Sequence, residues 1–146
     1  MSIDSRTIYL SDTSAADNDK SWTVPTNRIW SLKAARCVLT SSDTVGNRLI
    51  QLTVDPNLTT PAADTLPYVD IRAGVAQAAS LTYYYNFFHG ASRITTIADT
   101  DWASIQLPDA DLRPGSVIRI FDSANVDASS DQLDVKLVIE ARGGVT

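Results

Sequence analysis

Histidine and cysteine, which serve as base and nucleophile in many enzymes, are scarce in this chain. The only histidine is His89, and the only cysteine is Cys37. A nucleophile needs a base held beside it. Cys37 lies in an apolar run, which predicts a small buried hydrophobic residue. His89 lies in an apparent turn, which predicts a solvated loop histidine, and no Gly-x-Ser-x-Gly turn is present. The sequence therefore predicts no catalytic residue and no enzyme activity.

Metal ligands of the zinc type are equally scarce, because a zinc site takes several Cys or His side chains. Oxygen ligands for calcium are available in three places: Asp99 and Asp101; Asp109 and Asp111; and the group Asp122, Asp127 and Asp131. None of these has the spacing of a calcium loop closed by Glu. Aspartates between strands usually form turns by bonding nearby backbone, which is our interpretation here. With no glycine-rich phosphate loop either, we predict no metal site and no cofactor, and leave a structural calcium ion open.

The charge of the chain argues against two classes of partner. The formal net charge is −5, and the arginines are scattered along the sequence. Nucleic-acid binding relies on clustered Lys and Arg, so no nucleic-acid partner is expected. No stretch approaches the roughly 20 apolar residues of a membrane span, and residues 1–10 lack the features of a secretory signal. We expect synthesis in the cytoplasm and no membrane partner.

Composition points to β structure. Glu140 is the only glutamate among 17 acidic residues, and only three lysines occur. A chain that avoids Glu and Lys but uses Thr, Val, Ile and Tyr freely has little material for exposed helical faces and much for pleated sheet. Hydrophobic residues make up 44% of the 146 residues, which is enough for one good core.

Alternating apolar residues and turn signals predict about eight strands. The expected strands are residues 7–10, 29–40, 48–54, 68–72, 81–88, 103–107, 117–121 and 133–141. The apolar phase changes within residues 29–40, which predicts a β-bulge near Ala34. Three prolines between residues 54 and 68 predict a loop, and residues 74–79 are long enough for one helical turn.

This pattern predicts an all-β fold, an antiparallel two-sheet sandwich of the jelly-roll kind, with an immunoglobulin-like sandwich as the main alternative. Residues 1–20 are expected to form a polar N-terminal arm or an edge strand, and residues 21–146 the sandwich domain. If residues 1–20 form an arm, we expect this arm to reach a neighbouring subunit.

The most unusual local feature is the aromatic run at residues 83–88. Alternation places Tyr83, Tyr85 and Phe87 on one face and Tyr84 and Phe88 on the other. A strand that is apolar on both faces is either central to packed layers or covered by another subunit. We expect subunit contact, and the candidates for partner contact are Tyr9, Trp22, Tyr84 and Phe88.

Five short motifs and two aspartates resemble those of a known protein family. The motifs are SWTVP (21–25), WSL (30–32), VGNR (45–48), QAAS (77–80) and RPGSVIRIFDSA (113–124), followed by Asp127 and Asp131. Over residues 21–141 the chain resembles small virion structural proteins of tailed bacteriophages. The resemblance implies a jelly-roll-like module without enzymatic activity, used as a capsid decoration or cement protein and often trimeric.

The resulting hypothesis is a homotrimer on the capsid surface of the virion, bound across neighbouring major capsid protein subunits. Three alternatives stay open. A tail, neck or baseplate component would share the fold but occur in few copies. A carbohydrate-binding module for host attachment would expose aromatics such as Trp22 or Tyr84 in a groove, and a glycan-cleaving enzyme would need paired aspartates in a cleft.

Overall fold

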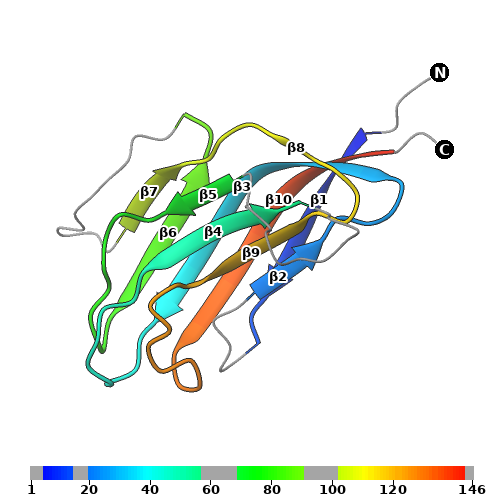
Figure 1. The fold of residues 1–146 in the computed structure, drawn as a ribbon. Coiled ribbons are helices and arrows are strands. Elements are labelled where there is room, and N and C mark those ends of the chain that lie inside the picture. The colour runs from blue at the N-terminus through cyan, green and yellow to red at the C-terminus, as the bar shows by residue number, and fades with distance from the viewer. Residues whose placement is uncertain (1–4, 15–19, 57–68, 91–101, 144–146) are drawn as a thin grey trace.

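The chain folds as a sandwich of two β-sheets packed face to face (Figure 1). The computed structural model describes residues 5–14, 20–56, 69–90 and 102–143, and this part of the chain contains ten strands and no helix. Accordingly, no helix in the described residues could cross a membrane. The strands are β1 Ser5–Asp12, β2 Lys20–Thr23, β3 Arg28–Thr40, β4 Ile50–Asp55, β5 Val69–Arg72, β6 Thr82–Phe88, β7 Trp102–Gln106, β8 Asp111–Leu112, β9 Val117–Asp122 and β10 Gln132–Gly143.

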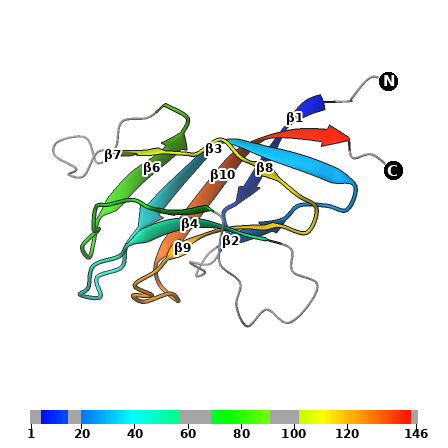
Figure 2. The same cartoon turned by 45° about the horizontal axis from the view of Figure 1, so that its top comes forward.

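The strand order is that of a jelly roll. The six-stranded sheet has the order β1-β10-β3-β6-β7, with the short β8 paired to β3, and the four-stranded sheet has the order β2-β9-β4-β5. Leaving aside β7 and β8, each strand is followed by one in the other sheet, except that β4 is followed by its neighbour β5. The two halves of the chain therefore interleave in both sheets, as in a jelly roll. Figure 2 shows the two layers from a second direction. The predicted all-β, two-sheet fold is confirmed.

Three details differ from the sequence expectations. β6 and β7 pair in parallel, with Tyr84 opposite Trp102, whereas all strands were expected to be antiparallel. Thirteen residues separate these strands, which is long enough for the return that a parallel pair requires. The short strands β2 and β8 were not predicted, because neither has an alternating apolar pattern. Residues 74–79 form bends and a bridge at Gln77 rather than a helical turn.

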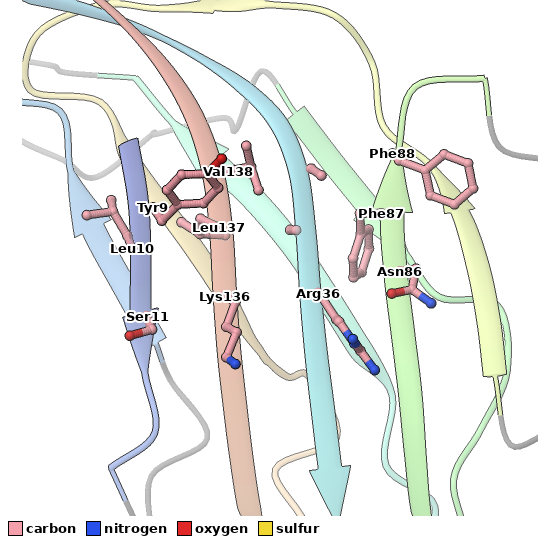
Figure 3. A pocket seen from close by; sticks show the side chains of 12 residues that line it. Tyr9, Leu10, Ser11, Arg36, Asn86, Phe87, Phe88, Lys136, Leu137 and Val138 are labelled. Atoms are coloured by element: carbon pink, nitrogen blue, oxygen red, sulfur yellow. The ribbon is translucent and has the colours of Figure 1, made fainter. Parts of the chain in front are cut away.

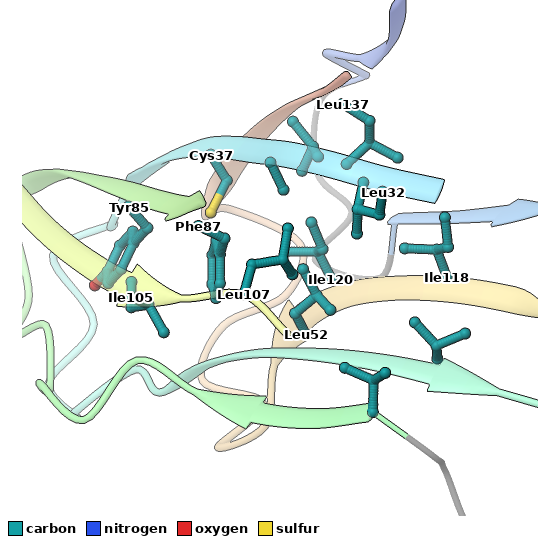
Figure 4. Close-up of a cluster of buried hydrophobic side chains, with 14 of the residues drawn as sticks. Leu32, Cys37, Leu52, Tyr85, Phe87, Ile105, Leu107, Ile118, Ile120 and Leu137 are labelled. Carbon is teal, nitrogen blue, oxygen red and sulfur yellow. The ribbon is translucent and has the colours of Figure 1, made fainter. Parts of the chain in front are cut away.

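The core lies between the sheets and follows the predicted alternation. In β10, Leu133, Val135, Leu137 and Ile139 are all buried, and they meet the inward residues of the other sheet (Figure 4). Burying one such side chain contributes about 1.5–3 kcal/mol. In β3 the predicted bulge is present: Val138 pairs with Ala34 and Ile139 with Leu32, so that Lys33 is the extra residue. The bulge lets both apolar phases of β3 face the core.

Residues 5–12 form the edge strand β1, antiparallel to β10 along its whole length. A fully buried lysine, Lys20, connects the start of β2 to the end of β1. The Lys20 ammonium donates to the Ser14 carbonyl at 2.7 Å and to the Ser14 hydroxyl at 2.8 Å, and it lies 3.5 Å from the Asp12 carboxylate. These contacts satisfy the three N–H groups of a cation that burial would otherwise penalise.

A second buried cation joins two loops at one end of the sandwich. Arg48 and Asp131 are both buried, and Nε and Nη2 of Arg48 donate to the two carboxylate oxygens at 2.9 and 3.1 Å. Nη1 donates to the carbonyls of Thr44 and Gly46 at 2.9 and 2.7 Å, and Nη2 also donates to the Ser42 hydroxyl. Every N–H of the guanidinium therefore has an acceptor. This pair ties the β3–β4 loop to the β9–β10 loop.

Candidate functional site

The outer face of the six-stranded sheet carries three rows of side chains that run across the strands. Strand pairing sets these rows, because outward residues that are directly opposite each other lie side by side. The apolar row is Tyr9, Val138, Ala34 and Phe88; the cationic row is Ser11, Lys136, Arg36 and Asn86; and the aromatic row is Asp134, Val38, Tyr84 and Trp102. The rows combine residues from β1, β10, β3, β6 and β7, which are far apart in the sequence.

A depression of about 690 Å³ lies over the first two rows (Figure 3). We call it the outer-face groove, and its main side chains are Tyr9, Ala34, Arg36, Phe88, Lys136 and Val138. The small side chain of Ala34 leaves space at the centre, where both neighbouring strands carry larger residues. Tyr9 and Phe88 stand at the two ends of the apolar row and are 76% and 40% exposed. Exposed apolar surface of this kind makes the groove a candidate association site.

Two cations lie beside this apolar surface. Arg36 and Lys136 are adjacent across the β3–β10 pair and both are exposed. In the described part of the chain, neither forms an ion pair within 4.0 Å. The carboxylates on the same face of β10 are Asp134, which accepts a hydrogen bond of 2.6 Å from Gln132, and Glu140, which lies 3.5 Å from the Lys33 ammonium. The groove is thus locally basic in a chain whose net charge is −5.

The aromatic row is packed against Arg36. The rings of Tyr84 and Trp102 stack with their centroids 4.7 Å apart and an interplanar angle of 17°. The guanidinium carbon of Arg36 lies 5.5 Å from the Tyr84 centroid and 4.9 Å from the Trp102 centroid. Cation–π contacts hold the guanidinium of Arg36 against these stacked rings at the edge of the groove.

Comparisons with protein-family models, curated proteins and solved structures find no match to this chain. The candidate site therefore depends on the geometry of the outer face.

The structure places the four predicted partner-contact residues in different settings. Tyr9 and Phe88 line the outer-face groove, and Tyr84 lies in the neighbouring aromatic row. Trp22 lies elsewhere: it pairs with the inward-facing Ile118 in the other sheet and packs, half-buried, against the core. Sequence reasoning did not single out Arg36, whose signal was a charged residue at an outward position of a mostly apolar strand.

The two residues considered for nucleophilic chemistry, Cys37 and His89, are both packed within the fold. Cys37 is buried, as predicted, and burial raises the pKa of its thiol, which disfavours the thiolate. His89 is half-buried, which corrects the expectation of a solvated loop residue. Its Nδ1 lies 2.7 Å from the Leu107 carbonyl and its Nε2 lies 3.2 Å from the Leu32 carbonyl. The ring thus bridges the end of β6 to β3 and to the residue after β7.

Four of the aspartates considered as calcium ligands, Asp111, Asp122, Asp127 and Asp131, are engaged with neighbouring groups. Asp122 accepts from the backbone N–H groups of Leu49, Ala124 and Val126, as a turn-forming aspartate does. Asp127 accepts from three hydroxyl groups, and Asp131 binds Arg48. No group of three metal-ligating side chains converges within the described ranges. Asp99 and Asp101 lie outside the described residues.

Proposed function

We propose that this chain is a non-enzymatic structural protein of a tailed-phage virion, a decoration or cement protein that binds across neighbouring major capsid protein subunits as a homotrimer. The observation that carries the proposal is the outer-face groove, an exposed apolar surface on an otherwise ordinary sandwich. The resemblance over residues 21–141 supplies the identity of the partner. The groove supplies a surface for it.

The physical basis of such a function is burial of area across subunit boundaries. A stable interface removes about 800 Å² of surface from each partner, and its core is apolar with a polar rim. The outer face has that composition, with the apolar row next to the cationic row. Each contact is modest, but a trimer that engages several shell subunits gains affinity through multivalency. The expected effect is a shell that withstands internal pressure.

The deciding experiment is the copy number of the protein in purified particles, measured by quantitative mass spectrometry against the major shell protein. Hundreds of copies in fixed ratio to the shell support decoration. A handful of copies assigns the protein to the tail, neck or baseplate, and its absence from particles overturns the virion proposal.

A carbohydrate-binding module is the second candidate, favoured by the exposure of the Tyr9 ring. Sugars stack on open aromatic faces, and the other aromatics of the outer face are less available, with Phe88 only 40% exposed. Tyr84 and Trp102 cover one another, with Arg36 over both. A glycan array with the full chain tests this candidate. Binding that is lost in Tyr9→Ala supports it, and no binding on the array counts against it.

A further inference from the structure

We propose that the outer-face groove binds an extended acidic segment of the partner protein, in which apolar side chains alternate with carboxylates. The apolar side chains would pack on the row from Tyr9 to Phe88, and the carboxylates would meet Arg36 and Lys136. This inference deepens the proposed function and rests on it for the identity of the partner. The chemistry of the segment follows from the groove alone.

The dimensions of the groove fit a short extended segment. Tyr9 and Phe88 lie on β1 and β6, which are separated by β10 and β3. Three strand spacings of about 4.8 Å place the ends of the apolar row roughly 14 Å apart, and an extended chain covers that span with about four residues. A segment lying between the two rows would direct alternate side chains to the apolar row over Ala34 and Val138. The intervening side chains then point to the opposite side, toward the cationic row.

Charge complementarity selects an acidic segment. The cationic row places two exposed cations on neighbouring strands, and neither has a carboxylate within 4.0 Å among the described residues. The stacked rings of Tyr84 and Trp102 hold the Arg36 guanidinium in place, so that little freedom is lost when it binds a carboxylate. Arg and Lys donate strong charge-assisted hydrogen bonds to carboxylates. An incoming carboxylate supplies the partner that the described residues of this chain do not.

A second copy of this chain related by a two-fold axis fits the groove less well. A two-fold contact places the same patch of both subunits together. Two copies of the Arg36 and Lys136 pair would then lie near each other, and like charges repel.

The test uses the full-length ¹⁵N-labelled protein and six-residue peptides with alternating leucine and aspartate. Chemical-shift changes on titration report binding even at millimolar Kd, and two further peptides carry asparagine or lysine in place of aspartate. The proposal expects shifts centred on β1, β10, β3 and β6 with the aspartate peptide. It expects at least roughly tenfold weaker binding of the other two peptides, and weaker binding at high salt.

Matched variants locate the site. Arg36→Gln with Lys136→Gln removes both cations and is expected to weaken binding of the aspartate peptide about tenfold or more. The control Arg28→Gln with Arg113→Gln removes two exposed positive charges outside the groove and is expected to leave binding unchanged. Ala34→Trp fills the centre of the groove from an outward-facing position and is expected to abolish binding. An unchanged spectrum outside the outer face confirms that each variant is folded.

The proposal is overturned if the three peptides bind equally, if none binds, or if the control variant loses as much affinity as the groove variant. Concentration-dependent dimerisation that Ala34→Trp abolishes would assign the groove to a second copy instead. A parallel binding assay with purified shells separates this inference from the proposed function. Shell binding that survives Arg36→Gln with Lys136→Gln overturns only the groove chemistry, whereas peptide binding without shell binding overturns only the virion function.

Discussion

Two arginines in this molecule have nearly opposite surroundings. Arg48 is fully buried between two loops, and each of its N–H groups meets an acceptor, two of them from Asp131. Arg36 lies exposed on a sheet face, packed on the rings of Tyr84 and Trp102, with no ion pair in the described part of the chain. A charge whose hydrogen bonds are completed inside the fold stabilises the fold. A charge that is held in place but not paired is available to a partner.

The largest effect expected from this contrast is on the buried pair. Asp131→Asn removes the carboxylate that compensates the buried Arg48 guanidinium, and breaking such a pair costs about 3–5 kcal/mol. Urea unfolding followed by circular dichroism measures the loss. The matched change on the outer face, Arg36→Gln, is expected to alter the unfolding free energy by no more than about 0.5 kcal/mol. Equal losses at the two sites would contradict the contrast.

The two lysines that form ion pairs repeat the contrast at a smaller scale. Lys20→Ala removes a buried ammonium that donates to the carbonyl and hydroxyl of Ser14. We expect this change to lower the free energy of unfolding by about 2 kcal/mol. Lys33→Ala breaks an exposed pair with Glu140, for which about 0–1 kcal/mol is expected. Hydrogen exchange provides a second readout, because only Lys20→Ala should increase exchange in β1.

The stack on the outer face gives a smaller, pairwise effect. A double-mutant cycle of Tyr84→Ala and Trp102→Ala is expected to show a coupling of about 0.5–1.5 kcal/mol in unfolding experiments. The double variant should also weaken binding of the aspartate peptide, because Arg36 loses its support. Additive effects on stability, or unchanged peptide binding, would show that the stack does not position Arg36.

The smallest effect is the response to acid. Hydroxyl donors, above all Ser42 to Asp127 and Ser14 to Asp12, hold the pKa of these two carboxyl groups below the ordinary value of 3.8. A carboxyl group with a lowered pKa in the folded state adds stability that is complete above the unfolded pKa. That stability is lost as the pH falls through the lower folded value. Asp127→Asn should therefore flatten the decline in urea midpoint below about pH 4, and an unchanged decline would refute this assignment.

Much of the fold could be predicted because it depends on local patterns. The alternation in β10 and the change of apolar phase in β3 gave the inward faces and the bulge at Lys33. The parallel pairing of β6 with β7 could not be predicted from the sequence, because the direction of a strand depends on the path of the connection before it. Either direction of β7 would bury Ala103 and Ile105 equally well. The strands β2 and β8 are too short to show a period.

The candidate site was harder to predict for a related reason. Tyr9, Tyr84 and Phe88 were identifiable as aromatics at outward positions, and the structure gathers them on one face. Trp22 is also aromatic but packs against the core, which only the pairing of β2 with β9 reveals. The adjacency of Arg36 and Lys136 depends on strands 100 positions apart in the sequence, so no local signal identifies it.

The pairing of β1 with β10 has a consequence for biosynthesis. Tyr9 is made early, but its strand acquires its only described neighbour when residues 132–143 emerge from the ribosome. Sheets built from such distant segments fold late, because the chain must close a long loop first. The outer-face groove, which needs residues from both strands, is complete only at that stage. An unfinished chain thus lacks the surface through which the finished one is proposed to bind.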